Sequence, residues 1–278
     1  MNRVLRCAGF TFDTQTPRIM AILNATPDSF SGDGMVGQRD VLLRRAECAL
    51  KDGAALLDVG GESSRPGALP VSEQEELDRV IPLVEALADS GAAVSVDTVK
   101  PVVMREAIRA GAALINDISA LQADGALDVV AGSDAGVCLM HMQGAPRTMQ
   151  QAPHYDDVVT EVAATLARRA ARLEAAGVAG ERIVLDPGFG FGKTLAHNVA
   201  LFRALGQLSA RYPVLAGVSR KSMLGAITGQ PVEARMVASA VAAALAVHAG
   251  ACWVRVHDVA ATRDALAVLA ALGPASCS

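Results

Sequence analysis

The sequence is 278 residues long, which is enough to bury roughly three quarters of the unfolded surface in one folded unit without help from disulfides. Hydrophobic residues make up 51% and charged residues only 19%, a composition that excludes a disordered chain. The formal net charge is -4, from 25 Lys and Arg against 29 Asp and Glu. Nucleic-acid-binding proteins have the opposite balance, so we expect no nucleic-acid partner.

The cysteines are few and widely spaced, and none forms a Cys-x-x-Cys pair. An odd count with this spacing argues against a disulfide framework or a zinc site, and it favours a reducing, cytoplasmic location. The longest apolar stretch, residues 236–247, is shorter than the roughly 18 residues that a membrane span needs. We therefore expect a soluble protein with no export signal and no membrane partner.

Short apolar runs bounded by Gly, Asp or Pro predict eight strands in chain order: 19–25, 56–60, 93–97, 114–118, 137–141, 183–186, 214–219 and 253–257. Helical patterns lie between them, for example at 41–51, 73–87, 102–110, 158–176, 199–210 and 231–249. A strand followed by a helix, eight times, predicts an α/β fold of the (β/α)8 TIM-barrel class.

The residues before the first barrel strand predict a small addition to the barrel. Phe10 and Phe12 alternate with polar residues ahead of a TQTP turn, which is typical of a short hairpin. Such a hairpin could close the N-terminal end of the barrel. We therefore expect one domain over residues 1–278, with a hairpin in 1–18 and the barrel in 19–273.

Polar side chains stand at the end of every predicted strand. A barrel carries its active site at the carboxyl ends of its strands. The candidates are Asn24; Glu62 to Arg65; Asp97; Asn116 and Asp117; His141 and Gln143; Asp186; Ser219 to Ser222; and Arg255 to Asp258. Any one of them could simply satisfy loop backbone. All eight together favour a site.

These polar residues divide into two groups of different chemistry. One group holds acids and an amide: Asp97, Asn116 and Asp186. The other is basic and follows the last two strands, where barrels commonly hold phosphate: Lys221, Arg255 and His257. Arginine forks match phosphate oxygens, which suits a phosphate or diphosphate. Carboxylates with an amide suit a neutral heterocycle whose edge offers N–H and C=O groups.

Three local features have simpler interpretations. Residues 187–194, PGFGFGKT, nearly form a phosphate-binding P-loop, but Pro187 replaces the first glycine and the segment follows a barrel strand. The run GVSRK is not a nucleophile elbow, since Lys221 stands where that motif requires glycine. His141 is better interpreted as a hydrogen-bonded structural histidine than as a ligand.

Taken as a set, the segments at the strand ends resemble the dihydropteroate synthase family over nearly the whole chain. They are ILNATPDSFS from Ile22, DVGGESSRPGA from Asp58, SVDTVKP from Ser95, INDIS from Ile115, LMHMQGAP from Leu139, LDPGFGFGKT from Leu185, GVSRKSMLG from Gly217 and VRVHDV from Val254. The resemblance implies a pterin-binding barrel of folate biosynthesis. Such an enzyme condenses (7,8-dihydropterin-6-yl)methyl diphosphate with 4-aminobenzoate to give 7,8-dihydropteroate and diphosphate, with Mg²⁺.

The resemblance also implies a role for individual positions. Pterin contacts fall on Asp97, Asn116, Asp186 and Lys221, and diphosphate contacts on Asn24, Arg255 and His257. Asn24 would also be the Mg²⁺ ligand, since Mg²⁺ keeps much of its hydration. The remaining substrate-binding positions are Ser222 with the backbone after Lys221 for the aminobenzoate carboxylate, Phe191, Pro66 and Arg65 around its ring, and Ser64 and Arg220. Residues 26–34 and 63–67 would be mobile lids over a pocket that sulfonamides also enter.

The implied chemistry requires charge stabilisation more than a strong base. Loss of diphosphate leaves a cation delocalised over the pterin, so both separating charges need partners. The catalytic residues would be Asp97, Lys221, Arg255 and His257, with no general base. Two positions depart from the family pattern: Ser64 stands where threonine is usual, and SGDG ends the first lid where SDGG is commoner. The second departure leaves open which residues near Asp33 enter the site.

Three other functions would share part of this pattern. A methyltetrahydrofolate-dependent methyltransferase would share the acid and amide group but would not need the basic one. An aldolase could use Lys221 as a Schiff-base amine. A non-catalytic pterin-binding paralogue is the third alternative.

The run MVASAVAAALAV at 236–247 is apolar on nearly every face, which predicts a homodimer through its outer side.

Overall fold

Eight parallel strands form one closed sheet in this computed structural model, which describes residues 4–25, 35–63 and 69–273. The strands are β3 (Arg18–Asn24), β4 (Leu56–Gly60), β5 (Val94–Asp97), β6 (Leu114–Asp117), β7 (Gly136–Met140), β8 (Ile183–Asp186), β9 (Leu215–Ala216) and β10 (Trp253–Val256). Their order is β8-β7-β6-β5-β4-β3-β10-β9, and a parallel bridge between Leu185 and Val214 joins the two edges. The predicted TIM barrel is confirmed.

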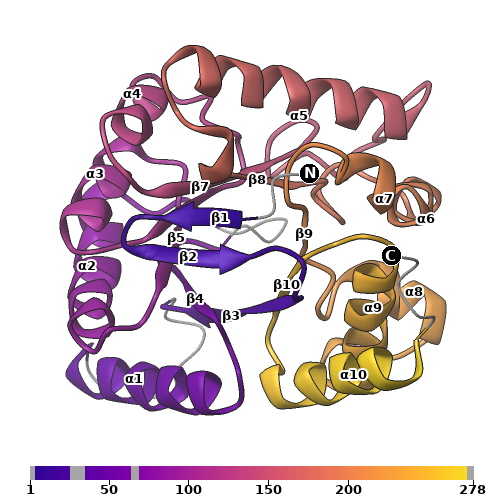
Figure 1. Cartoon of the computed structure of the whole chain (residues 1–278), viewed down its shortest axis with the longest axis horizontal. Helices are drawn as coiled ribbons and strands as arrows, with labels where there is room; N and C mark the ends of the chain where they lie inside the picture. Colours follow the sequence, from indigo (N-terminus) through magenta and orange to yellow (C-terminus); the bar gives the residue numbers. More distant parts are fainter. Residues whose placement is uncertain (1–3, 26–34, 64–68, 274–278) are drawn as a thin grey trace.

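Helices surround the sheet on its outer side (Figure 1). They are α1 (Met35–Lys51), α2 (Glu73–Asp89), α3 (Pro101–Arg109), α4 (Ala126–Ala131), α5 (Val158–Ala175), α6 (Leu195–Arg203), α7 (Leu205–Leu208), α8 (Ser222–Thr228), α9 (Met236–His248) and α10 (Val259–Leu272). Side chains alternate along each strand between the helices and the barrel interior. Leu57, Val96 and Ile115 thus pack in the main core against the helices, whereas Asp58, Asp97 and Asn116 face inward.

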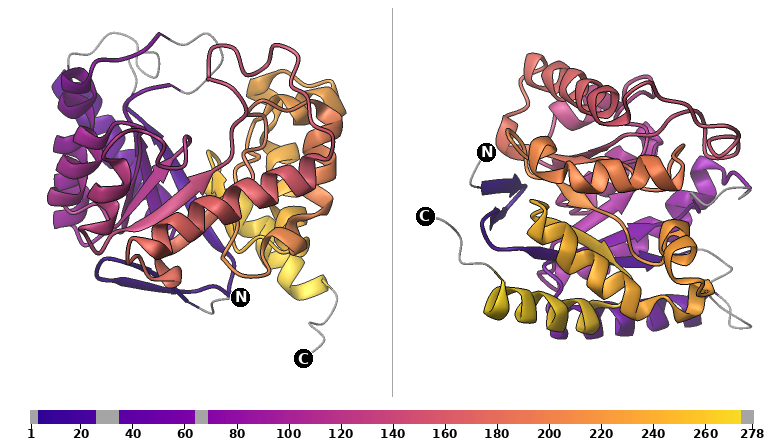
Figure 2. Two further views of the ribbon diagram at one scale, coloured as in Figure 1. Left: turned by 90° about the horizontal axis from the view of Figure 1, so that it is seen from above. Right: turned by 90° about the vertical axis from the view of Figure 1, so that its right-hand side faces the viewer.

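An antiparallel hairpin closes one end of the barrel, as the aromatic alternation predicts (Figures 1 and 2). It consists of β1 (Val4–Cys7) and β2 (Phe10–Asp13). Leu5, Cys7 and Phe12 are buried in a second core cluster with the first inward residues of the strands, among them Trp253. Phe12 meets Trp253 edge to face, with ring centroids 5.1 Å apart. This hairpin seals the N-terminal end of the barrel and leaves the carboxyl ends of the strands for a site.

Several elements differ from their predicted bounds for identifiable reasons. Strand β9 has two residues because the chain leaves the sheet after Ala216, and Arg220 adopts a left-handed φ of 56°. Helix α6 begins earlier than expected because Thr194 and His197 form a capping box there. The helix expected over 231–249 is interrupted at Arg235, so that α9 begins at Met236 after a short 3-10 turn, Val232–Ala234.

Candidate active site

A buried network of charged side chains crosses the barrel interior near the carboxyl ends of the strands. Asp58 accepts hydrogen bonds from Arg255 Nε and Ser95 Oγ, both at 2.5 Å, and from Asn116 Nδ2 at 3.1 Å. Arg255 Nη2 donates to Asp97 Oδ2 at 2.8 Å. The strand register produces this contact set, since Asp58 lies beside Ser95 and Asp97 beside Asn116. Two of the predicted pterin residues and Arg255 are therefore brought together.

Asp58 is the site residue that the sequence argument missed. It is only 1% exposed and accepts hydrogen bonds from three side chains. A usable signal was present, because a charged residue inside the apolar strand LLDVG must find a partner when it is buried. The partner could not be named from the pattern. Arg255 comes from the last strand, which lies one strand beyond β3 in the closed sheet.

The electrostatics of this network centre on one guanidinium between two carboxylates. Burial raises the pKa of Asp97 to about 7; Arg255 opposes this shift and Asp58 adds to it. Burial alone would lower the pKa of Arg255, but Asp58 and Asp97 raise it above its ordinary value. Arg255 thus stays charged, while Asp97 titrates near neutral pH. Its position after the last strand grouped Arg255 with the basic residues, but the structure places it among the acids, because inward-facing side chains of β4, β5 and β10 meet in the barrel interior.

A second part of the site lies at the ends of β8 and β9. Asp186 is buried, and its Oδ1 accepts the backbone N–H of Gly188 at 2.7 Å. Lys221 Nζ donates to the carbonyl oxygen of Phe189 at 2.6 Å and lies 4.2 Å from the ring centroid of Phe191. Burial lowers the pKa of Lys221 to about 8, and Asp186 opposes that shift. Burial also raises the pKa of Asp186, which Lys221 opposes. The opposite charges of the two residues thus each offset part of the effect of burial on the other.

The third part lies where β3 and β10 end side by side. His257 Nδ1 is 3.0 Å from Ser219 Oγ, which also accepts the backbone N–H of His257 at 3.2 Å. Ser219 can then donate its hydroxyl hydrogen to Nδ1, which leaves Nε2 protonated as a donor. Asn24, Arg220 and His257 line part of a cavity of about 630 Å³ that continues between β3 and α1. Arg220 donates to both oxygens of Asp258, at 2.7 and 3.1 Å.

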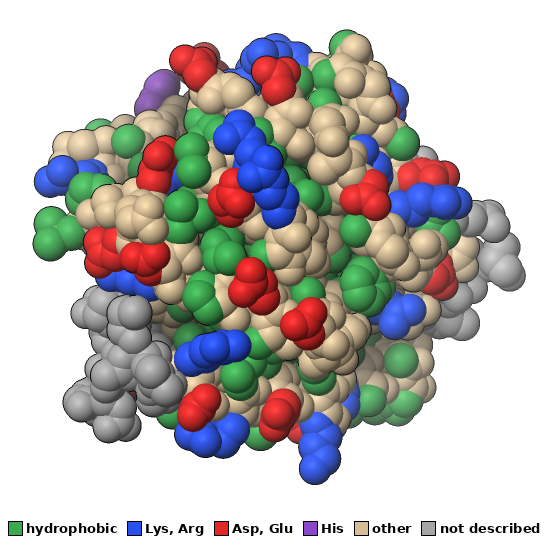
Figure 3. Space-filling model, turned by 90° about the vertical axis from the view of Figure 1, so that its left-hand side faces the viewer, with side chains coloured by type: hydrophobic (Ala, Val, Ile, Leu, Met, Phe, Trp, Pro, Cys, Tyr) green, Lys and Arg blue, Asp and Glu red, His purple; other side chains and the backbone are tan. Residues whose placement is uncertain are grey.

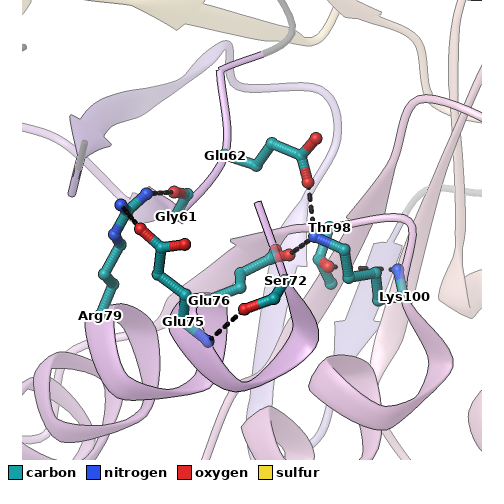
Figure 4. Close-up of polar contacts among 8 residues, drawn as sticks. All are labelled: Gly61, Glu62, Ser72, Glu75, Glu76, Arg79, Thr98 and Lys100. Carbon is teal, nitrogen blue, oxygen red and sulfur yellow. Dashed lines mark hydrogen bonds and ion pairs between the residues drawn. The ribbon is translucent and has the colours of Figure 1, made fainter. Parts of the chain in front are cut away.

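The loop after β4 leaves the barrel over a set of ion pairs, shown in Figure 4. Lys100 Nζ donates to Glu62 and to the buried Glu76, at 2.5 Å each. Arg79 donates to the carbonyl oxygen of Gly61 at 2.9 Å. A side chain at position 61 would crowd Glu76, so glycine permits this close packing. These contacts fix the chain at the end of β4, just before the predicted substrate-binding residues Ser64, Arg65 and Pro66. Those three residues, and 26–34 of the first predicted lid, lie outside the described residues.

In residues 4–25, 35–63 and 69–273, no helix is long and apolar enough to cross a membrane. The same residues contain no group of three or more His, Cys, Asp or Glu side chains that could hold a metal ion.

The closed barrel carries acids, an amide and basic side chains at the carboxyl ends of its strands, which is where a TIM-barrel enzyme has its active site. Comparison with known proteins agrees, since the model of the family described as "Pterin binding enzyme" matches residues 20–257. The chain is also 50% identical over 258 residues to the dihydropteroate synthase of Haemophilus influenzae, covering 92% of this chain and 94% of that protein. It therefore belongs to the dihydropteroate synthase family, and it is a transferase of folate biosynthesis.

Solved structures of the family share the fold closely. The Burkholderia cenocepacia enzyme complexed with 7,8-dihydropteroate is 53% identical, with a TM-score of 0.89 and coverage of 97% and 96% of the two chains. The Xanthomonas albilineans enzyme with 4-aminobenzoic acid is 47% identical, with a TM-score of 0.90 and 98% coverage of both. The Yersinia pestis enzyme in a sulfonamide drug complex is 48% identical, with a TM-score of 0.91 and coverage of 96% and 98%. These likenesses favour dihydropteroate synthase over the methyltransferase and aldolase alternatives.

Proposed function

We propose that this site binds (7,8-dihydropterin-6-yl)methyl diphosphate across its parts, with the pterin over the buried acids and the diphosphate toward His257. The observation that carries this proposal is that Asp97, Asn116 and Asp186 stand at the carboxyl ends of β5, β6 and β8, on the same side of the barrel. Asn116 directs its Nδ2 to Asp58, which leaves its Oδ1 to accept from a pterin N–H. Asp186 Oδ2 faces Gly217, which has no side chain to fill that space. The B. cenocepacia complex with 7,8-dihydropteroate supports this assignment.

The reaction then proceeds by loss of diphosphate and attack of an amine. The bond between the pterin methylene carbon and the diphosphate oxygen breaks, and its electron pair leaves with the diphosphate. Ionised Asp97 stabilises the cation that spreads over the pterin, next to Lys221 and Arg255. The neutral aryl amine of 4-aminobenzoate forms the new C–N bond and releases a proton to solvent. No general base is needed.

The diphosphate end uses donors from β3 and β10. Arg255 holds Asp58 and Asp97 through Nε and Nη2, which leaves Nη1 for a phosphate oxygen, and the imidazole of His257, just beyond β10, is a second proposed contact. Asn24 ends β3 at the rim of the cavity, half-buried, and its amide oxygen fits Mg²⁺, a hard cation that needs only one or two protein ligands. When bound, Mg²⁺ would neutralise charge on the departing diphosphate.

The 4-aminobenzoate site is assigned to the neighbouring β8 and β9 loops. Phe191 presents its ring beside Lys221, and Ser222 is exposed at the start of α8, where its hydroxyl and the backbone after Lys221 can receive a carboxylate. Ser64, Arg65 and Pro66 complete this pocket in the proposal, with Arg220 at its basic edge. The X. albilineans structure with 4-aminobenzoic acid and the Y. pestis sulfonamide complex support a pocket of this kind.

We further infer a homodimer and a cytoplasmic location. Val237, Val241 and Leu245 form an exposed apolar stripe on α9, and α10 also exposes Val268 and Leu272. A stripe of this kind is covered when two copies meet about a two-fold axis. The described cysteines Cys7, Cys48, Cys138 and Cys252 are all free thiols, which suits a reducing compartment.

Calorimetry with each ligand alone tests whether the diphosphate and the pterin bind to separate parts of the site. In His257→Ala, we expect the dissociation constant of diphosphate with Mg²⁺ to rise about tenfold, because one charge-assisted donor is lost. Binding of 6-hydroxymethylpterin should stay within about twofold. His154→Ala removes an exposed histidine and serves as the matched control. Unchanged diphosphate affinity in His257→Ala would remove His257 from the phosphate site.

A further inference from the structure

The lysine of the P-loop-like segment points into the protein instead of toward the barrel opening. Lys193 is only 3% exposed. Its Nζ lies 3.0 Å from the carbonyl oxygens of Gly188 and Phe191 and 3.2 Å from that of His141. Three carbonyl oxygens match the three N–H groups of an ammonium, so backbone oxygens can accept from all of them. Lys193 is therefore not a phosphate ligand, and it needs another explanation.

Hydrogen bonds link Lys193 to His141 just after β7, and His141 in turn to the end of β8. His141 Nδ1 lies 3.1 Å from Lys193 Nζ, and the backbone N–H of His141 donates to the carbonyl oxygen of Asp186 at 2.9 Å. Burial and the charge of Lys193 lower the pKa of His141 to about 3, so its ring is neutral and Nδ1 can accept. Burial and Lys221 lower the pKa of Lys193 to about 7, and Asp186 opposes this shift. This contact agrees with the interpretation of His141 as structural.

The loop that surrounds Lys193 carries the proposed aminobenzoate wall. The carbonyl oxygen of Gly188 accepts both Lys193 Nζ and the backbone N–H of Phe191, which closes a turn around the ammonium. Phe189, inside that turn, presents its carbonyl oxygen to Lys221, whose Nζ also lies over the Phe191 ring. Gly188 has a left-handed φ of 70°, and a side chain there would collide with the carbonyl oxygen of His141. The loop thus closes tightly onto β7.

We propose that Lys193 is a positioning residue for 4-aminobenzoate, which it affects by holding Phe191 and the Phe189 carbonyl in place from inside the loop. The inference rests on the proposed aminobenzoate site. Without the ammonium, three closely spaced carbonyl oxygens would lose their shared donor, and of these Gly188 alone would keep the second donor described above, the Phe191 N–H. The loop would then rearrange toward solvent, and Phe191 would leave the side of Lys221.

The kinetic test compares Lys193→Met with Tyr155→Phe. Methionine keeps the length of the side chain but has no donor. Tyr155→Phe is the matched control, because it removes one buried hydrogen bond from the same loop, the 2.9 Å contact to the Gly192 carbonyl oxygen beyond Phe191. In Lys193→Met, we expect the KM for 4-aminobenzoate to rise about tenfold while kcat falls less than about threefold. The control should keep both values within about twofold.

Hydrogen exchange supplies a readout that does not depend on turnover. In free Lys193→Met, amides 188–192 should exchange at least about tenfold faster than in the unmodified chain, with the other barrel amides unchanged. Lys193→Gln keeps one amide group as donor, so its exchange rates and its KM for 4-aminobenzoate should fall between those of Lys193→Met and those of the unmodified chain. Absence of turnover in the unmodified chain would refute the proposed function, while the exchange data would still decide whether Lys193 holds the loop. Unchanged exchange, an unchanged KM, or failure of both variants to fold would overturn the positioning role.

Discussion

Among single residues, Arg255 holds the site together because it bridges two carboxylates, the buried Asp58 and the half-buried Asp97. Its Nε donates to Asp58 and its Nη2 donates to Asp97, so one cation is paired with two acids. Removal of either partner from such a network leaves a buried charge without compensation, which is strongly unfavourable. This arrangement keeps the Arg255 guanidinium charged beside the proposed substrate site. It also leaves the pKa of Asp97 at about 7.

The raised pKa of Asp97 predicts a pH-dependent stability. Because burial raises this pKa from 3.8 to about 7, the folded protein holds a proton that the unfolded chain releases above pH about 4. The contribution of this group is therefore fully present at low pH and is lost as pH rises toward 7. We expect the free energy of unfolding of the unmodified chain, minus that of Asp97→Asn, to fall between pH about 4 and 7 and then to level off. Urea melts at several pH values measure this difference. A constant or rising difference would mean that Arg255 keeps Asp97 ionised throughout.

The residues of the site were only partly accessible from the sequence. Strand-end position predicted that Asp97, Asn116 and Asp186 stand at the same end of the barrel, as they do, because parallel strands of a barrel all end on one side. Asp58 escaped because it lies in the middle of β4 and acts through Arg255, and only the three-dimensional register brings these two together. The inward orientation of Lys193 was equally hidden, since a local motif does not reveal which way a long side chain turns.

Among the secondary-structure elements, the N-terminal hairpin should contribute to the stability of the barrel and not to substrate binding. Leu5 is fully buried and belongs to the cluster that closes the N-terminal end of the barrel, opposite the proposed site. The alternation of Phe10 and Phe12 was enough to predict this hairpin. Helix boundaries were less predictable, because the capping box at Thr194 depends on the folded geometry of the β8 loop and not on periodicity.

A truncation in the hairpin should therefore destabilise the protein without affecting substrate binding. For Leu5→Ala we expect a loss of about 2 to 5 kcal/mol in the free energy of unfolding, since a cavity is left in a packed cluster. Both KM values should stay within about twofold below the melting temperature. Denaturant melts and steady-state kinetics measure the two effects. A large rise in either KM would show that the two ends of the barrel are coupled.

For the whole molecule, the distribution of surface side chains distinguishes one face from another. On the side of α1 to α4, acidic and basic side chains are interspersed with apolar ones (Figure 3). Helix α9, in contrast, exposes Val237, Val241 and Leu245 in one stripe at a spacing of four residues. Sequence alone revealed the apolar character of this helix, and the structure adds which of its side chains face outward.

This stripe predicts a dimer that one charge should disrupt. In Val241→Glu, a carboxylate would be buried at the proposed interface without a partner, so we expect monomers at micromolar concentration. Leu69→Glu introduces the same charge at another exposed apolar position and should remain dimeric. Sedimentation velocity distinguishes the two states. A monomeric unmodified chain, or a dimeric Val241→Glu variant, would contradict the assignment of this face.

The most direct test of the whole account is product analysis with the pterin diphosphate, 4-aminobenzoate and Mg²⁺. The unmodified chain should release 7,8-dihydropteroate and diphosphate in equal amounts. In Asp186→Asn, the amide keeps an oxygen for Gly188 but offers an NH₂ group to the donor edge of the pterin. The resulting cost of about 1 to 3 kcal/mol should weaken pterin binding roughly 5- to 150-fold, with little change in the melting temperature. Formation of no dihydropteroate by the unmodified chain, or equal pterin affinity in both proteins, would contradict the account.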